Sequence, residues 1–348
     1  MSEVIILGPP ESNGGVGQYT SQFGEALGNT AVIRRFPVGI HPLSQWRSIV
    51  SSVRDSGSVI HVQFVYSFFG PAGISLFLIL PLMWILARVY EKNIIFTVHE
   101  VWGDDLLTNR FRRYYCQLLH LLLWFVVDDL VFISEMAKET FEKQAPGDSY
   151  TVVSHGVITD EVREISNAKR RFGYDESDTL ITQHGFINPR KGFETFLKIA
   201  ENLPEYEFLI AGGPRSEDNQ EYYNKIQAAA PPNVSITGVL DSEDFHAAFV
   251  ASDVAVMPYE AIFQSGIFNW CAAYEVPVVA TEIPYFRDIS KRFGAPLLFP
   301  PRDDEIGAER IKQLITNSDL QEQVSKGLIK YTEQNDIQSV VERYRDLY

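Results

Sequence analysis

The sequence predicts an α/β protein built from two doubly wound, Rossmann-like domains, each a parallel sheet with helices on both faces. Two observations predict this fold. Short, continuous apolar runs rich in β-branched residues alternate with helical stretches, and this pattern occurs twice in the 348 residues. Ligands of such sheets bind at the carboxyl ends of the strands. We therefore expect the functional residues in the loops there, along a cleft between facing domains.

The expected strands fall into two sets of six. The first set covers residues 4–8, 31–36, 59–65, 93–99, 129–134 and 150–156, and the second covers 180–186, 206–213, 234–240, 254–259, 276–281 and 295–300. A polar stretch without a strand pattern separates the sets and indicates a domain boundary. We predict an N-terminal domain over 1–165, a second domain over 166–335, and a C-terminal helix over 336–348 that packs on the N-terminal domain.

One apolar stretch has the length of a membrane span. Residues 68–87 contain no charged side chain, although Gly70, Pro71, Gly73 and Pro81 interrupt them. Strand-like runs flank this stretch, which favours a buried crossover helix between two parallel strands. Peripheral contact with a membrane surface is the alternative, and the basic residues at 110, 112 and 113 could support it.

The charge balance limits the partners. The chain has 30 basic and 45 acidic residues, a formal charge of −15, which argues against a nucleic-acid partner but permits a local pocket for a small anion. Cys116 and Cys271 lie in apolar surroundings, as expected in a reducing compartment. The first residues, Met-Ser-Glu, precede no basic and apolar leader, so we predict a cytoplasmic protein.

The first domain offers two candidate sites. Gly14 and Gly15 follow the first strand and open a helix, where backbone amides can receive an anion; a tight turn is the alternative. His99 ends the strand at 93–99 and precedes Glu100, a pair that can bind or polarise a polar ligand. A hydrogen-bonded core histidine is the alternative for His99.

The second domain offers two candidate anion sites. Arg190 and Lys191 lie in the loop that follows its first strand, just before a helix, a combination that suits a diphosphate; solvated surface cations are the alternative. Ser265 and Gly266 lie near the start of the helix that follows residues 254–259. An ordinary helix N-cap is the alternative there.

Taken together, the motifs resemble those of the family 4 glycosyltransferases, retaining enzymes of the GT-B fold that use nucleotide-sugar donors. The resemblance covers most of the chain in the family's order, and its segments are GGVGQYT (14–20), HVQFVYSFFG (61–70), TVHE (97–100), FISE (132–135), VVSHGV (152–157), GFINPRKGFETF (185–196), FLIAGGP (208–214), ITGVLDSEDFHAAFVASDVAVMPY (236–259) and QSGIFNWCAAYEVPVVAT (264–281).

The resemblance implies roles for individual residues. It implies catalytic roles for His99, Arg190 and Lys191, and donor-binding roles for Gly14, Gly15, Gly185, Val239, Leu240, Glu260, Gln264, Ser265, Gly266 and Ile267. Protein cations neutralise the leaving diphosphate in such enzymes, and no pair of aspartates stands where a metal would be held. We therefore predict no metal and no cofactor besides the donor substrate.

Several positions depart from the family pattern. The family carries two glutamates with seven residues between them around the last loop, and Ile262 and Trp270 stand at those positions here. Glu260 is a candidate replacement for the first. Glu275 stands where a glycine is usual. An arginine is usual two positions after the glycine of the first strand of the second domain, but Phe186 and Ile187 stand there, and Arg190 is expected to supply that charge.

The resemblance predicts a retaining, hexosyltransferase-like enzyme in polysaccharide or glycolipid biosynthesis. It moves a sugar from a nucleotide diphosphate sugar to a glycan or lipid-linked acceptor, in the cytoplasm or at the inner surface of the membrane. A catalytically inactive sugar-nucleotide-binding protein and a GT-B sugar-nucleotide epimerase are the alternatives, the first because the two glutamates are missing.

Overall fold

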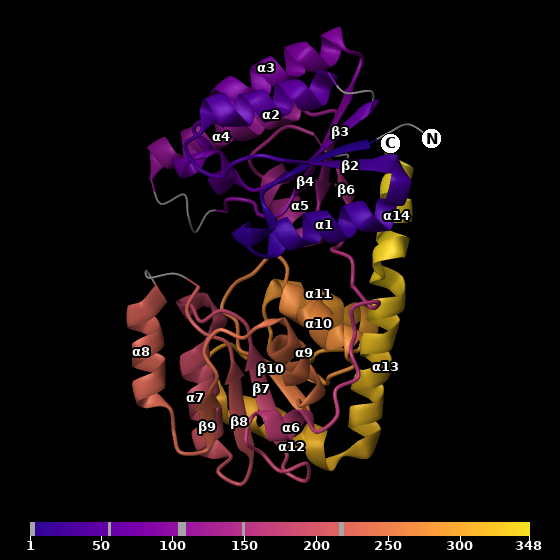
Figure 1. Cartoon of the computed structure of the whole chain (residues 1–348). Coiled ribbons are helices and arrows are strands. Elements are labelled where there is room, and N and C mark those ends of the chain that lie inside the picture. The colour runs from indigo at the N-terminus through magenta and orange to yellow at the C-terminus, as the bar shows by residue number, and fades with distance from the viewer. Residues whose placement is uncertain (1–3, 55–56, 104–108, 148–149, 216–218) are drawn as a thin grey trace. The chain divides into compact units, whose positions relative to one another are not determined.

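A computed structural model describes residues 4–54, 57–103, 109–147, 150–215 and 219–348 (Figure 1). The chain divides into two compact units. The first comprises the residues up to Gly156 together with Ile337–Tyr348, and the second comprises Val157–Asp336. The division lies before the expected boundary at residue 165, because Val157 is fully buried in the core of the second unit and its amide donates to the Asn335 carbonyl at 2.7 Å.

The first unit is a six-stranded parallel sheet in the order β2-β1-β3-β4-β5-β6. All six expected strands are confirmed, as β1 Val4–Gly8, β2 Ala31–Arg35, β3 Val59–Phe64, β4 Asn93–Val98, β5 Asp129–Phe132 and β6 Thr151–Val152. The helices of this unit are α1 Gly15–Leu27, α2 Pro42–Arg54, α3 Leu76–Val89, α4 Arg110–Val126, α5 Glu135–Glu142 and α14 Ile337–Arg345.

The helices of the first unit form two groups. Helix α3 packs between α2 and α4, whereas α1 packs against α14 (Figure 1). The strand order explains the grouping: the crossover from β1 to β2 runs in the opposite direction to all the others, and right-handed crossovers therefore put α1 on the opposite face of the sheet. The switch in direction lies between β1 and β3, where the chain leaves β1 toward Gly14.

The apolar stretch at 68–87 forms the crossover between β3 and β4, as expected, but its helix starts later. Helix α3 begins at Leu76, and the residues before it form two short 3-10 turns, η3 Tyr66–Phe69 and η4 Pro71–Gly73. The cause is the backbone of Gly70 and Gly73, whose φ angles of 87° and 67° end a helical run. Within the described ranges, the structure contains no helix with the length and apolar character needed to cross a membrane.

The second unit is a six-stranded parallel sheet in the order β12-β11-β10-β7-β8-β9. It confirms the second set of expected strands, as β7 Leu180–His184, β8 Glu207–Ala211, β9 Val234–Ile236, β10 Val254–Met257, β11 Val278–Thr281 and β12 Leu297–Phe299. Its helices are α6 Ala168–Arg171, α7 Phe193–Asn202, α8 Gln220–Ala229, α9 Ser242–Val250, α10 Gly266–Ala273, α11 Pro284–Phe293, α12 Asp304–Thr316 and α13 Ser318–Asn335.

The strand order of the second unit reverses direction between β7 and β10, which lie side by side. Helix α7 packs against α8 and α12, while α10 and α11 both pack against α13. Fully buried aromatic side chains, among them Phe193, Phe196 and Phe208, fill the core. In sheets of this order the ligand crevice opens at the reversal, beyond the carboxyl ends of the two strands.

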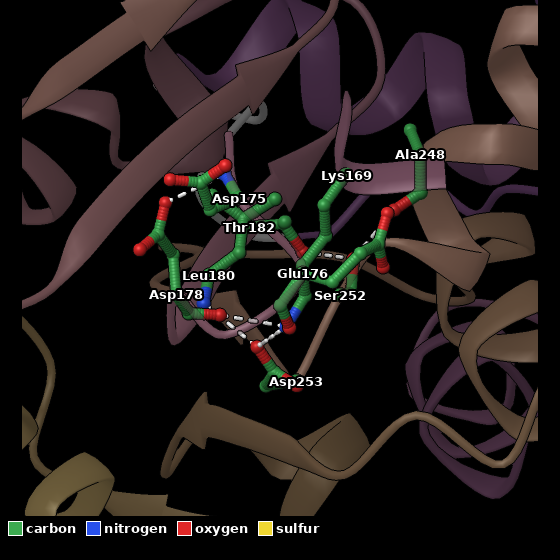
Figure 2. A network of polar contacts seen from close by, with 9 residues as sticks. All are labelled: Lys169, Asp175, Glu176, Asp178, Leu180, Thr182, Ala248, Ser252 and Asp253. Carbon is green, nitrogen blue, oxygen red and sulfur yellow. Dashed lines mark hydrogen bonds and ion pairs between the residues drawn. The ribbon is translucent and has the colours of Figure 1, made fainter. Parts of the chain in front are cut away.

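A polar network fixes the other ends of β7 and β10 (Figure 2). The Lys169 ammonium lies 2.7 Å from a carboxylate oxygen of Asp253 and donates to the Asp178 carbonyl at 2.6 Å. The same carboxylate oxygen accepts the Leu180 amide at 2.7 Å. Because Asp253 directly precedes β10 and Leu180 begins β7, the network holds the amino ends of these strands in register. The carboxyl ends are thereby held next to each other as well.

Helix α10 ends in a strained turn. The Val276 amide donates to the Cys271 carbonyl at 2.8 Å and the Glu275 amide donates to the Ala272 carbonyl at 3.1 Å, the two bonds of a Schellman cap. Such a cap requires one residue in the left-handed backbone conformation, and Glu275 adopts that conformation with a φ of 55°. Position 275, where the family usually has a glycine, is thus one at which glycine fits best.

We expect Glu275→Gly to raise the free energy of unfolding of the second unit by about 1 kcal/mol, because the left-handed conformation is costly for a residue with a Cβ. Urea unfolding at an unchanged m value measures this. The matched control is Gly294→Ala: Gly294 ends α11 with a φ of 80° and has open space around a Cβ, so strain alone should lower its stability by a similar amount. If both substitutions changed the free energy of unfolding in the same direction by the same amount, the strain assigned to Glu275 would be contradicted.

Candidate functional site

The loops that leave β7 and β10 approach each other closely. Gly192 has a φ of 67°, and a Cβ on it would lie 1.9 Å from the Pro258 carbonyl oxygen. One turn of 3-10 helix, η5 Pro189–Lys191, precedes it, and the Glu260 amide donates to the Arg190 carbonyl at 2.9 Å. The backbone contact therefore sets Arg190 and Lys191 beside the residues that follow β10.

Lys191 lies at the reversal of the sheet. Its Nζ donates to the His184 carbonyl at 3.3 Å and lies 5.8 Å from the centroid of the buried Tyr259 ring, a cation-π distance. Its own carbonyl accepts the Gln183 side-chain amide at 2.8 Å. Part of the side chain reaches solvent, but burial of the ammonium group lowers the Lys191 pKa to about 8. An anion at this point would raise that pKa and stabilise the charged form.

Glycines bring three loops together around this lysine. Gly185 has a φ of 94°, and a Cβ there would lie 2.5 Å from the Lys191 Nζ and 3.3 Å from the Ile267 side chain. A Cβ on Gly212 would lie 2.1 Å from the Gly185 carbonyl, and one on Gly213 would lie 2.6 Å from the Val239 amide. Of the predicted donor-binding residues, Gly185 thus lies beside both this lysine and Ile267, and Val239 lies beside Gly213.

The start of α10 is the second predicted anion site. Ser265 is buried and caps the helix, since its hydroxyl accepts the Phe268 amide at 3.1 Å. A Cβ on the exposed Gly266 would meet nothing within 4 Å, so the space beside the first turn is open. The side-chain nitrogen of Gln264 is buried and has no hydrogen-bond partner in the described part of the chain. A buried donor of this kind is satisfied when a ligand oxygen arrives.

The remaining predicted residues of this unit lie at the surface. Arg190 is exposed, Leu240 is half-buried, and Val239 is 63% exposed. Glu260 is exposed too, and its carboxylate pairs with Arg302 at 2.8 Å, which the sequence did not indicate. Ile262 and Trp270 pack against the apolar core. Neither position therefore carries a carboxylate, and Glu260, the acid nearest to Ile262 in sequence, is already paired.

In the first unit, Gly14 and Gly15 open α1. Gly14 adopts φ 85° and ψ −156°, a conformation suited to glycine, and as the N-cap residue it has no side chain with which to cap the helix. Three residues on, a Cβ at Gly17 would lie 2.2 Å from the Pro10 carbonyl, whereas one on Gly15 would meet nothing within 4 Å. The chain thus turns tightly from β1 into α1 and leaves open space at Gly15.

His99 is buried at the end of β4 and belongs to a chain of hydrogen bonds. Its Nε2 lies 2.7 Å from the Gln63 side-chain oxygen, and its Nδ1 lies 2.7 Å from Nε2 of His155. The His155 ring stacks on Tyr19 of α1 with 4.0 Å between centroids, and the Tyr19 hydroxyl accepts the Gly156 amide at 3.4 Å. This chain links His99 to the helix that Gly14 and Gly15 open.

The same chain continues toward the C-terminal helix. The Gln63 side-chain nitrogen lies 3.4 Å from Nε2 of His61, which also lies 2.7 Å from the Thr97 hydroxyl. Nδ1 of His61 lies 2.6 Å from the Tyr348 hydroxyl, and the Thr97 hydroxyl lies 2.7 Å from that of Tyr344. The segment Ile337–Tyr348 is thereby fixed to β3 and β4 by buried hydrogen bonds.

These histidines are neutral. Burial lowers the pKa of His61 and of His155 to about 3, and burial together with the neighbouring rings holds the pKa of His99 well below its usual value. In this arrangement both ring nitrogens of His99 already have partners, so neither is available to accept a proton from a substrate. The catalytic role expected of His99 stays a prediction.

Several residues of the two sites have no role that the sequence predicted. His99 is hydrogen-bonded to Gln63 and His155, and the His155 ring stacks on Tyr19. The lack of a Cβ at Gly212 and Gly213 lets neighbouring loops approach closely. One signal was present: two polar residues, His61 and Gln63, alternate with valine and phenylalanine in a strand that is otherwise apolar. Period-two alternation in such a strand indicates a polar network on one face of the sheet.

Comparison with known proteins matches residues 178–317 to the family described as glycosyl transferases group 1. Two curated proteins are similar over part of the chain. Alpha-galactosylglucosyldiacylglycerol synthase of Streptococcus pneumoniae is 25% identical over 130 residues, which are 36% of this chain and 34% of that protein. Processive diacylglycerol alpha-glucosyltransferase of Acholeplasma laidlawii is 22% identical over 120 residues, 34% and 36% of the two chains. The match thus spans about a third of these relatives.

Solved structures resemble the whole chain. HepE from Anabaena in complex with UDP and glucose aligns with a TM-score of 0.79 at 11% identity, covering 100% of this chain and 99% of HepE. Sucrose-phosphate synthase from Thermosynechococcus elongatus aligns with a TM-score of 0.76 at 14% identity, covering 99% and 98%. At these identities the likeness concerns the fold: each unit has the Rossmann-like architecture of the GT-B class.

We expect Gly192→Ala to lower the free energy of unfolding of the second unit by about 3 kcal/mol, because its Cβ would collide with backbone that cannot move without separating β7 from β10. The matched control is Gly173→Ala, with a φ of 87° and open space around a Cβ, which should cost only about 1 kcal/mol of strain. Denaturant unfolding of both variants measures the difference. Equal losses would mean that the Pro258 contact is not a constraint.

Proposed function

Because residues 178–317 belong to the glycosyl transferases group 1 family, and both units have the GT-B architecture, we propose that this protein is a retaining glycosyltransferase. It transfers a hexosyl group from a nucleotide diphosphate sugar to a lipid-linked or glycan acceptor. His99, Arg190 and Lys191 serve catalysis in this proposal, and the loops around Gly185, Val239 and Ser265 hold the donor. No metal and no cofactor besides the donor is required.

The surroundings of Lys191 are the single observation that carries the proposal. A buried ammonium at the carboxyl end of β7 lies next to Gly185, and the Ile267 side chain from the first turn of α10 lies next to the same glycine. The lowered pKa means that burial destabilises the charged ammonium of Lys191, and a bound anion would offset this destabilisation. A diphosphate bound there would accept a charge-assisted hydrogen bond from Lys191. Its other oxygens would accept hydrogen bonds from the amides at the start of α10 and from the Gln264 side chain.

The proposed reaction breaks the bond between the anomeric carbon and the β-phosphate oxygen, and the electron pair leaves with the diphosphate. The acceptor hydroxyl forms the new bond to the same carbon from the same face, and its proton passes to the departing phosphate oxygen. Lys191 and Arg190 stabilise the charge that develops on the diphosphate. A paired, neutral His99 supports this route, because it requires no proton transfer to a histidine.

The relatives guide the choice of substrates. Both curated relatives have diacylglycerol in their names, which supports a lipid-linked acceptor, and HepE binds UDP and glucose, which makes uridine donors the first to test. Cys116 and Cys271 are free and buried, and burial raises the Cys116 pKa to about 12, so its thiol is unreactive. Free cysteines fit a reducing compartment, which supports a cytoplasmic enzyme. The names of the two relatives support work at the inner membrane surface.

The function is tested with the purified protein and Lys191→Met. We expect one nucleotide diphosphate sugar to raise the melting temperature of the wild type and to be turned over with a diacylglycerol or glycolipid acceptor. Lys191→Met should weaken donor binding or turnover about 10- to 100-fold, the effect of one charge-assisted hydrogen bond. Lys198→Met, which removes an exposed charge from α7, is the control and should behave as wild type.

Three outcomes would contradict the proposal. Binding without turnover across several acceptors would indicate a sugar-nucleotide-binding protein, as the missing glutamates at 262 and 270 suggest. Conversion of the donor to an isomer without acceptor would indicate an epimerase. Unchanged turnover in Lys191→Met at saturating donor would remove the role assigned to this residue.

Donor binding should also depend on pH through Lys191. The free pocket holds this lysine with a pKa of about 8, and a bound diphosphate raises that pKa, so the complex binds more protons than the free protein. Affinity should therefore be constant below about pH 7 and fall by up to about tenfold per pH unit above pH 8. Calorimetry between pH 7 and 9 in two buffers measures the proton taken up, and Lys191→Met should abolish this uptake.

A further inference from the structure

Helix α4 of the first unit is apolar on two opposite sides. One side is buried and includes Leu119, Leu123 and Val126. The opposite side is exposed, and its residues follow one another at helical intervals of three and four. These are Phe111, Tyr114, Leu118, Leu121 and Phe125, with exposed fractions between 45% and 79%. A helix that is apolar all round is normally buried on both sides, so the exposed stripe lacks a partner.

Helix α3 shows the same arrangement. Leu76, Ile79, Leu80, Met83 and Ala87 are buried, and the opposite side exposes a second stripe. This stripe consists of Ile74, just before the helix, and of Leu78, Ile85 and Val89, with exposed fractions between 50% and 68%. Two neighbouring helices of one sheet face therefore each present large apolar side chains to solvent.

The two stripes form one surface. The Phe77 and Tyr115 rings lie 5.4 Å apart, and the Trp84 and Phe125 rings lie 5.6 Å apart. These contacts join the two helices near their beginnings and near their ends, and the helices pack against each other. We call the exposed residues of both stripes, with the partly exposed Trp84 between them, the α3–α4 apolar face. Exposed apolar surfaces of this extent mark sites of binding to a protein or a membrane.

The charges of these two helices differ from those of the chain as a whole. The chain has 45 acidic and 30 basic residues, yet neither α3 nor α4 contains an aspartate or glutamate. Three exposed arginines, Arg110, Arg112 and Arg113, occupy the first turn of α4. Cations at a helix N-terminus oppose the helix dipole, so the stability of α4 does not account for them. They suit an anionic partner instead.

We propose that the α3–α4 apolar face docks on the surface of a membrane that contains anionic lipid. The leucine, isoleucine, phenylalanine and tryptophan side chains enter the boundary between headgroups and acyl chains, and the arginines at the start of α4 bind lipid phosphates. The combination of tryptophan, tyrosine and arginine beside leucine is typical of helices that lie in this boundary. The docking would bring the enzyme to its lipid-linked acceptor, and to that extent it rests on the proposed function.

Vesicle flotation of the full chain tests the docking. The wild type should float with phosphatidylcholine vesicles that contain about one third phosphatidylglycerol, less at high salt, and weakly with phosphatidylcholine alone. Phe111→Ser with Leu118→Ser and Leu121→Ser should weaken binding to anionic vesicles at least about tenfold. Arg110→Gln with Arg112→Gln should weaken it about 30-fold, the effect of two charges at an anionic surface, and reduce its salt dependence.

The matched control is Val250→Ser with Ile329→Ser, which removes exposed apolar groups from the second unit and should float as wild type does. Each variant should keep the wild-type melting temperature, since the replaced side chains are exposed. Equal flotation of the triple serine variant and the control would overturn the proposal. So would a wild type that does not float but forms a dimer that the serine substitutions dissociate. Flotation without any glycosyl transfer would reject the proposed function and leave the docking intact.

Discussion

The second unit depends on a contact between two backbones. The Pro258 carbonyl occupies the space in which a side chain at position 192 would begin. The loops after β7 and β10 can then lie against each other, and Lys191 is carried over the Tyr259 ring. The ion pair of Lys169 and Asp253 fixes the far ends of the same strands. Two adjacent strands held at both ends form a rigid frame, and a rigid frame keeps an ammonium group buried although burial disfavours its charge.

The fold could be predicted from the sequence because its signal is local and repeated. Each strand of the two sheets is a short apolar run, and polar or glycine-rich segments bound most of them. The prediction failed where tertiary packing or backbone conformation, and not the local pattern, determined where an element or a domain begins. Val157 looks like part of a polar linker, yet it is buried in the second core, and the helix expected near residue 68 begins only at Leu76 because of the backbone at Gly70 and Gly73.

The candidate site could be predicted only in part. Residues adjacent in sequence to a strand end, such as Lys191 and Ser265, were found because parallel strands end at one edge of the sheet. Partners from distant segments were not: His155 lies 56 residues from His99, and Arg302 lies 42 residues from Glu260. A single sequence contains no signal for such pairs. The close approach of neighbouring loops at glycines around Lys191 likewise depends on distances that only coordinates supply.

The hydrogen-bond chain from His155 to Tyr348 has a direction. Each neutral imidazole donates from one nitrogen and accepts at the other, so the orientation of the Gln63 amide decides the tautomer of His99 and of His61 on either side of it. Rotating that amide by half a turn would reverse every donor and acceptor along the chain. The Gln63 amide therefore couples the tautomer of His99 to that of His61. His155 and Tyr348, which bind these two histidines from opposite ends, are linked through that one side chain.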